Sequence, residues 1–246
     1  MKAILTYHSI DDSGSVISVD STILRKHASW LASGRVRVVP LSALGRQPAG
    51  SDAVAITFDD GFQNFASTAW PILREHGLDA TVFVVTGRVG STNRWTDSTD
   101  PTVPDLPLMG WDTIGKLADE GVEIGSHGRT HRPLGGLPAE ALASELEGSA
   151  AAIRERAGVD PTSLAYPYGA HDAAAELAAR RYYERACTTR LAALEAEDDP
   201  HLLPRLDSYY YRAEGRLEAW GTSVFRTHLW LRGSARRVRR AVTGAR

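Results

Sequence analysis

The sequence predicts an α/β fold, a distorted (β/α)7-type barrel of parallel strands. Short apolar runs alternate with amphipathic segments along most of the chain, and glycines stand where several amphipathic segments should end. Alternation of this kind is typical of parallel strands joined by right-handed helical crossovers. A length of 246 residues suits one large barrel better than two small domains.

Seven apolar runs are the expected strands: Ala3–Tyr7, Val36–Val39, Ala53–Thr57, Ala80–Val85, Val122–Ile124, Ser163–Ala165 and Arg185–Cys187. Five segments between them are the expected helices: Ser21–Ala32, Gln63–His76, Trp111–Glu120, Ala139–Ala157 and Asp172–Arg181. Asp20 and Asp112 are the expected caps of the first and third helices, because a short acidic side chain accepts hydrogen bonds from free backbone N–H groups. Pro71 lies early in the second helix and can kink it at Trp70.

Two regions depart from this alternation. Residues 90–107 form a long polar stretch that carries Trp95, and a long loop in a compact domain is more often functional than idle. The tail from Phe225 to Arg246 holds seven arginines and no acidic residue. Three interpretations of this tail are open: a helix packed on the barrel with its basic face in water, a patch for an anionic membrane surface, and a docking segment for a partner protein.

Composition excludes several classes of protein. Lys and Arg number 28 against 30 Asp and Glu, so the net charge of −2 argues against a nucleic-acid-binding protein. Cys187 is the only cysteine, so no internal disulfide is expected. We expect it to be a buried structural thiol. The start of the chain is predicted to be a strand rather than a secretory signal, and no apolar run approaches a membrane span. We therefore expect a cytoplasmic protein, with peripheral membrane association through the tail as an alternative.

Two pairs of polar residues follow predicted strands. Asp59 and Asp60 come after the third strand, and His127 and His131 come after the fifth. The carboxyl ends of parallel strands lie on one rim of a barrel, so these side chains are expected to meet. One Asp and two His can hold a divalent metal with a position left for water, and the second Asp is then free to act as a base. The pattern favours a metal-assisted hydrolase.

Three segments resemble motifs of the polysaccharide deacetylase family (carbohydrate esterase family 4, the NodB-homology domain). They are Thr57–Gly61, Ser126–His131 and Leu164–Gly169, the last in a Tyr-Pro-Tyr-Gly variant. The opening segment Leu5–Ile10 resembles that of members found with exopolysaccharide gene sets. The likeness implies a NodB-like catalytic domain at residues 1–212, which removes N- or O-acetyl groups from sugars, and leaves residues 213–246 as a basic C-terminal helical extension.

Carried over residue by residue, the resemblance implies that Asp60, His127 and His131 ligate the metal and that Asp59 is the general base. Zinc is the expected ion, and cobalt, nickel or manganese also suit such a ligand set.

The third motif implies one wall of the substrate groove. Tyr166, Pro167 and Tyr168 would form this wall, and a backbone N–H near Tyr168 would hold the oxyanion. Trp95 is expected to stack on a sugar ring from its polar loop.

Two family features are missing at their usual positions. The arginine that many members carry in the third motif is replaced by Ala165, and Arg205, from a later strand, is the expected substitute that orients the catalytic Asp. The usual late histidine has no clear counterpart. His8, at the end of the first strand, is the expected general acid, ahead of His171 and His201.

The expected function is metal-dependent removal of N-acetyl groups from N-acetylhexosamine units of a poly- or oligosaccharide, in exopolysaccharide biosynthesis. Two alternatives are a catalytically inactive carbohydrate-binding or scaffold domain and a related hydrolase of another linear or cyclic amide.

Overall fold

The computed structural model describes residues 1–95 and 102–243, with the side chains of the last helix up to Arg236. Its main sheet has the strand order β10-β1-β5-β6-β7-β8-β9, with β4 beside β5. All the pairings in this sheet are parallel. The strands are β1 (Lys2–Tyr7), β4 (Arg37–Val38), β5 (Ala53–Phe58), β6 (Thr81–Val84), β7 (Glu123–Ser126), β8 (Ser163–Ala165), β9 (Arg185–Cys187) and β10 (Leu206–Asp207). A second sheet pairs β2 (Ser9–Ile10) with β3 (Ser18–Val19).

The segment after β9 brings the two ends of the sheet together. The N–H of Thr188 donates to the carbonyl of Leu203 at 2.8 Å, and the N–H of Leu203 donates to the carbonyl of Ala186 at 2.9 Å. A few residues later β10 pairs with β1, with Leu206 opposite Leu5. The sheet therefore curls into the distorted barrel that the sequence predicts.

The continuous apolar runs form strands that are buried on both faces, as is usual for parallel sheets. Every residue of β5 is buried. Val54, Ile56 and Phe58 of this strand face the surrounding helices, whereas Ala53 and Ala55 face the barrel interior. The one polar side chain of this strand is that of Thr57, whose hydroxyl donates to the carbonyl of Leu5 at 2.9 Å, and the first carboxylates of this segment come after the strand ends, at the rim.

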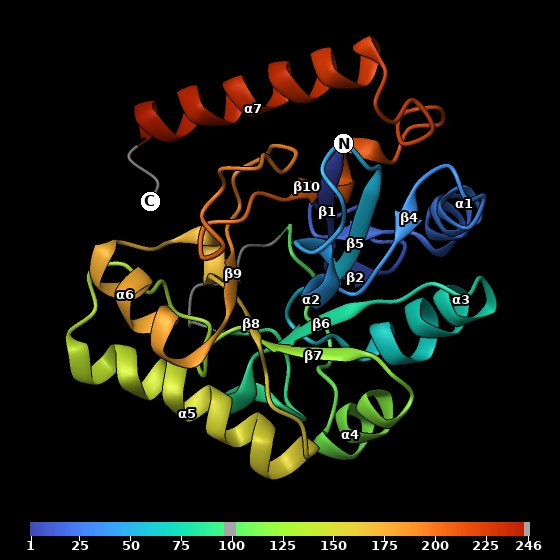
Figure 1. The fold of residues 1–246 in the computed structure, drawn as a ribbon. Helices are drawn as coiled ribbons and strands as arrows, with labels where there is room; N and C mark the ends of the chain where they lie inside the picture. The colour runs from blue at the N-terminus through green and yellow to red at the C-terminus, as the bar shows by residue number, and fades with distance from the viewer. Residues whose placement is uncertain (96–101, 244–246) are drawn as a thin grey trace.

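Except for the short α2, whose Leu41 and Leu44 pack into the barrel interior, the helices lie outside the sheet (Figure 1). They are α1 (Ser21–Leu31), α2 (Leu41–Leu44), α3 (Trp70–Glu75), α4 (Trp111–Asp119), α5 (Ala139–Ala157), α6 (Ala173–Tyr182) and α7 (Ser223–Thr243), with one π turn, η1 (Phe65–Ala69), and three 3-10 turns, η2 (Thr86–Arg88), η3 (Pro167–Gly169) and η4 (Ser208–Tyr211). Asp20 caps α1, as expected, by accepting from the N–H of Ile23 at 2.9 Å. The expected cap Asp112 lies instead in the first turn of α4, and Gly110 precedes that helix.

The helix expected over Gln63–His76 is divided in two. Its first part is η1, in which the N–H of Trp70 donates to the carbonyl of Phe65, five residues back. Pro71 follows at the start of α3. Because proline has no N–H to donate, the usual bond to the carbonyl four residues back is missing, and the helix widens there into a π turn.

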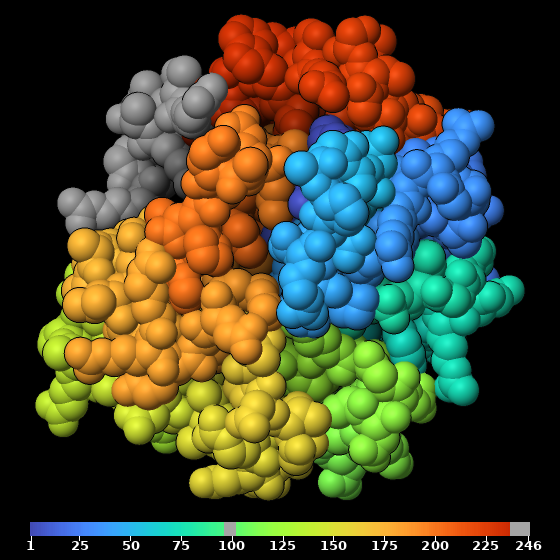
Figure 2. Space-filling model, in the orientation of Figure 1, coloured from blue at the N-terminus to red at the C-terminus, as the bar shows by residue number. Residues whose placement is uncertain are grey.

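The helix α7 lies apart from the others, along the outside of the barrel beyond β1 and β10 (Figure 1). The space-filling view shows it running along one edge of the molecular surface (Figure 2). It covers most of the basic tail, of which Arg246 lies outside the described residues. Within the described chain, none of the helices is both long and apolar enough to span a membrane.

Candidate active site

The two carboxylates leave β5 through a tight turn. The N–H of Asp59 donates to the carbonyl of Tyr7 at 2.9 Å, and the N–H of Gly61 donates to the carbonyl of Asp59 at 2.9 Å. Asp60, between them, has a φ of +70°. Both side chains are buried, so the turn places two acids side by side at the rim without exposing either to bulk water.

Asp60, His127 and His131 converge on one point. Oδ1 of Asp60 lies 3.5 Å from Nε2 of His127 and 3.2 Å from Nε2 of His131. One ligand atom from each residue lies within 4.8 Å of the other two. All three residues are buried, and Oδ1 of Asp60 accepts no hydrogen bond from the described residues. A buried carboxylate oxygen without a donor, facing two ring nitrogens, fits a divalent metal.

The other nitrogen of each imidazole has its own partner. Nδ1 of His127 lies 2.8 Å from the carbonyl of Ala165, and Nδ1 of His131 lies 3.1 Å from the hydroxyl of Tyr168. A carbonyl only accepts, so Nδ1 of His127 carries the proton and Nε2 keeps its lone pair. Burial lowers the pKa of His127 to about 4, although the nearby carboxylates of Asp59 and Asp60 act in the opposite direction. The ring is therefore neutral near pH 7, the state in which imidazole binds a metal.

Arg205 makes a bidentate ion pair with Asp59. Its two terminal nitrogens lie 2.6 Å and 2.7 Å from the two carboxylate oxygens, and its Nε donates to the carbonyl of Thr188 at 3.0 Å. Both residues are buried. Burial alone would raise the pKa of Asp59, but the adjacent guanidinium charge outweighs it and holds this pKa well below its usual range. Arg205 thus supplies a charge at Asp59 that the third motif lacks.

The backbone at this rim is locally strained. Asp60, His131 and Tyr168 are the only described residues other than glycine with positive φ, at +70°, +60° and +59°. Side chains other than Gly, Asn and Asp rarely adopt this conformation. Strain of this kind persists where the surrounding structure fixes it, and it clusters at functional sites. All three positions adjoin the Asp-His-His group.

Glu145 fixes the loop between the two histidines, and sequence reasoning missed it. One carboxylate oxygen accepts from the N–H of Arg129 at 2.8 Å and from the N–H of Thr130 at 2.9 Å, and the other accepts from the hydroxyl of Thr130 at 2.5 Å. Glu145 is buried on α5 between Leu142 and Leu146. The sequence feature that could have indicated this role is the position of Glu145, an acidic residue among the apolar positions of an amphipathic helix.

The structure brings His8 and Trp95 to the same rim. Nε2 of His8 lies 3.8 Å from Oδ2 of Asp59, and the ring of Trp95 lies 4.3 Å from that of His131. The side chain of His8 is partly exposed, at 28%, so solvent and a bound molecule can reach it.

Part of the expected groove wall is wrong. Tyr166 is fully buried among apolar side chains and Pro167 is also buried, so neither can touch a substrate. Only Tyr168 of the three is exposed, at 49%. The strand β8 ends at Ala165, directly before Tyr166. The side chains of Tyr166 and Pro167 are buried, and only that of Tyr168 reaches solvent. The Tyr-Pro-Tyr-Gly pattern gave no sign of that order.

The weaker candidates for the general acid have structural partners instead. Nδ1 of His171 pairs with Glu176 at 2.8 Å, and Nε2 of His201 lies 2.9 Å from the carbonyl of Tyr183. Cys187 is buried, and burial raises its pKa to about 12, so it is the inert thiol that the sequence predicts.

A sequence profile of the polysaccharide deacetylase family matches residues 46–185. The chain belongs to this family. The match covers more than half of the chain and includes the two acids, the two histidines and the third motif. Its members are hydrolases and are generally metal-dependent, and the Asp-His-His group described above can hold such an ion.

Related proteins agree with this assignment. The chain is 27% identical over 209 residues to YxkH of Bacillus subtilis, a protein named for polysaccharide deacetylation, covering 82% of this chain and 70% of that one. It is 30% identical over 78 residues to the poly-β-1,6-N-acetyl-D-glucosamine N-deacetylase of Escherichia coli, covering 28% of this chain and 12% of that one.

Solved structures share the fold. IcaB from Ammonifex degensii superposes with a TM-score of 0.72 at 21% identity, covering 85% of this chain and 93% of that one. The Streptococcus pyogenes deacetylase PplD, solved with acetate, gives a TM-score of 0.71 at 18% identity, covering 83% and 91%. At this identity the likeness establishes the fold, which is the parallel curled barrel of this family.

Proposed function

We propose that this protein is a metal-dependent deacetylase that removes N-acetyl groups from N-acetylhexosamine units of a poly- or oligosaccharide, in exopolysaccharide biosynthesis. Residues 1–212 would carry the catalysis. One observation supports the proposal above the rest: a buried, ionised carboxylate, Asp59, held by Arg205 beside a separate group of three metal ligands. A binding or scaffold domain would have no need to keep this charged pair out of water.

Asp60, His127 and His131 would hold the ion, with zinc as the first choice and cobalt, nickel or manganese as alternatives. When bound, such an ion makes a coordinated water more acidic and polarises the acetyl carbonyl.

Asp59 would be the general base. Its carboxylate is ionised at neutral pH, and Oδ2 lies 4.0 Å from Nε2 of His127, so it adjoins the ligand group without belonging to it. Arg205 acts as a positioning residue because it occupies both carboxylate oxygens and fixes the plane of the group. Asp59 accepts the proton of the attacking water.

His8 would be the general acid. Its Nε2 lies 3.8 Å from Oδ2 of Asp59, and its side chain is more exposed than those of Asp59, Arg205 and the three ligand residues. In the second half of the reaction, the protonated ring donates to the nitrogen of the departing amine, as bond cleavage requires.

Trp95 and Tyr168 would contact the sugar. Both rings contact the ring of His131: its centroid lies 4.3 Å from that of Trp95 and 4.6 Å from that of Tyr168. Aromatic faces beside a reactive centre suit the apolar face of a pyranose ring. A backbone N–H near Tyr168 would stabilise the oxyanion.

The substrate class is supported by the named relative from Escherichia coli, which acts on poly-β-1,6-N-acetyl-D-glucosamine. The test is release of acetate and free amine from that polymer and from chitooligosaccharides, after chelation and after return of each metal in turn. We expect no release after chelation and recovery with zinc. Failure to release acetate from any N-acetylated glycan, whatever the metal, would favour a carbohydrate-binding domain instead.

A further inference from the structure

One side of α7 attaches the helix to the barrel. Phe225 is buried and its ring lies 5.2 Å from that of Tyr211, and Leu229 packs against the same core. Farther along, Arg236 pairs with Asp207 at 3.3 Å. These side chains lie on one face of the helix, because positions separated by three, four and seven residues share a face.

The opposite side of α7 is apolar and exposed. Val224 and Trp230 are each 64% exposed and Leu231 is 54% exposed. These three are half of the large apolar side chains that stand exposed in the described chain. A group of large apolar side chains exposed on one helix indicates a surface that binds something.

Charge surrounds this apolar face. Arg226 is exposed next to it, whereas Arg232, although exposed, lies on the attached side with its guanidinium 5.3 Å from the ring of Tyr210. All 30 acidic residues of the chain lie before α7, whereas seven arginines lie between Phe225 and Arg246. A helix with Trp and Leu on one face and arginines beside them is typical of segments that lie in the plane of an anionic membrane surface.

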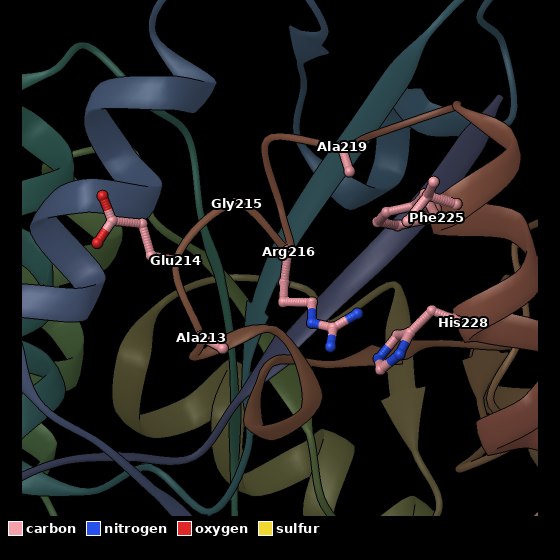
Figure 3. Close-up of a pocket in the computed structure, with 8 residues that line it drawn as sticks. Ala213, Glu214, Gly215, Arg216, Ala219, Phe225 and His228 are labelled. Carbon is pink, nitrogen blue, oxygen red and sulfur yellow. The ribbon is translucent and has the colours of Figure 1, made fainter.

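A hollow of about 350 Å³ adjoins this face, between α7 and residues 213–219 (Figure 3). The side chain of Arg216 points into it toward His228, whereas Glu214 points away, toward α1, where it pairs with Lys26 at 3.6 Å. Among the described residues Arg216 forms no ion pair, and Nε2 of His228 has no hydrogen-bond partner. The guanidinium of Arg216 is a cationic donor that can bind a phosphate oxyanion in this hollow.

We propose that α7 docks the protein on an anionic lipid bilayer. Val224, Trp230 and Leu231 enter the interface, and the arginines lie at the level of the headgroups. Because Val224 also lines the hollow, Arg216 lies at the edge of this surface and binds the phosphate of one lipid. A lipid surface fits better than a protein partner because the flanking charge has one sign throughout and the central side chains are those of a membrane interface.

The experiment is co-sedimentation of the full chain with vesicles of phosphatidylcholine alone and of phosphatidylcholine mixed with phosphatidylglycerol. We expect binding to the mixed vesicles only, and weaker binding at high salt, because screening shortens the reach of exposed charges. Each arginine at an anionic surface contributes about fivefold in affinity, so Arg226→Gln should lower it by about that factor.

The double variant Trp230→Ser with Leu231→Ser should lower vesicle affinity by about tenfold or more, because both side chains leave the interface. Its matched control is Leu177→Ser on α6, an apolar side chain that is 61% exposed but lies outside this surface. The control should bind vesicles like the unmodified protein. None of these residues belongs to the active site, and circular dichroism with thermal unfolding reports whether each variant is folded.

Two outcomes overturn the proposal. One is equal binding to neutral and anionic vesicles by the unmodified protein, or none to either. The other is loss of binding in the Leu177→Ser control as large as in the α7 variant. The hollow is tested by Arg216→Gln, which should weaken binding to the mixed vesicles. Binding of inorganic phosphate to the hollow by a protein that does not bind vesicles would assign the hollow to a free anion. Since vesicle binding requires no catalysis, this test is independent of the deacetylase proposal.

Discussion

The active-site rim and α7 use arginine in opposite ways. At the rim, Arg205 is buried and both of its terminal nitrogens contact one carboxylate. On α7, Arg226 and Arg232 are exposed, and no acidic residue follows Glu218 in the sequence. The difference shows which groups the fold has already committed. The rim pairs the charge of Asp59 within the protein and holds it in a fixed position, whereas Arg226 on α7 forms no ion pair with any described residue and stays available to an external surface.

The first prediction concerns the buried carboxylate of Asp59. Asp59→Asn should lower kcat by about a thousandfold, since a positioned general base typically contributes a factor of that order. Metal affinity should stay the same, because Asp60 and the two histidines remain. Amine release measures kcat, and the absorption spectrum of bound cobalt measures the metal site. Full activity in this variant would remove Asp59 from the mechanism.

The second prediction compares a buried ion pair with an exposed one. Arg205→Met should lower the free energy of unfolding by about 3–5 kcal/mol, because Asp59 stays buried without a partner. Arg25→Met breaks an exposed pair with Glu75 and should cost less than about 1 kcal/mol. Urea denaturation of the two variants measures both. Equal losses of unfolding free energy in the two variants would mean that the buried ion pair contributes no more to stability than the exposed one.

The third prediction concerns pH. Burial lowers the pKa of His127 to about 4, whereas an unfolded histidine titrates near about 6.5. The unfolded chain therefore binds the proton first as the pH falls, and the metal-free protein should lose up to about 3 kcal/mol of stability over this interval. Urea denaturation at several pH values measures the slope. His127→Asn should show a shallower slope, and an unchanged one would contradict the assignment.

The fourth prediction concerns the support of the metal loop. Glu145→Ala should weaken metal binding by about tenfold to a hundredfold, as loss of an outer-shell partner typically does. Glu145→Gln should recover much of the loss, because its amide oxygen still accepts from the two N–H groups. Glu147→Ala, an exposed position on the same helix, is the control. Cobalt titration measures all three variants.

The smallest effect belongs to α7. Trp230→Ser should change the free energy of unfolding by less than about 0.5 kcal/mol, because its side chain has no packing to lose. Phe225→Ser, on the buried face of the same helix, should cost several times more. Thermal unfolding of both variants measures the difference, and a large loss in Trp230→Ser would show that this face is already in use.

The sequence was informative wherever the chemistry of a residue type by itself determines where that residue lies. The strands that carry Asp59 and His127 were predicted because continuous apolar runs cannot remain in water. The meeting of acids and histidines at one rim followed from the parallel topology. Arg205 as partner of Asp59 was inferred from the absence of an arginine in the third motif, and the two are joined in the structure.

The misses have a different cause. The end of β8 at Ala165 was predicted correctly, but nothing local to Tyr166 and Pro167 shows that these two side chains are buried. The contacts of Glu145 are made with a loop on another element, so its role depends on tertiary packing. The two-residue strand β10 is too short to show any periodicity. Each of these depends on contacts between distant segments, which a single sequence does not display.

Asp59 and Arg205 are separated by 146 positions along the chain, and the segment that carries the arginine is the one that closes the barrel. During synthesis the carboxylate therefore emerges from the ribosome long before its counter-ion. The charged form of Asp59 can be buried without a large desolvation cost only once this segment has docked. Burial of the acid and closure of the barrel are therefore expected to occur in one cooperative step.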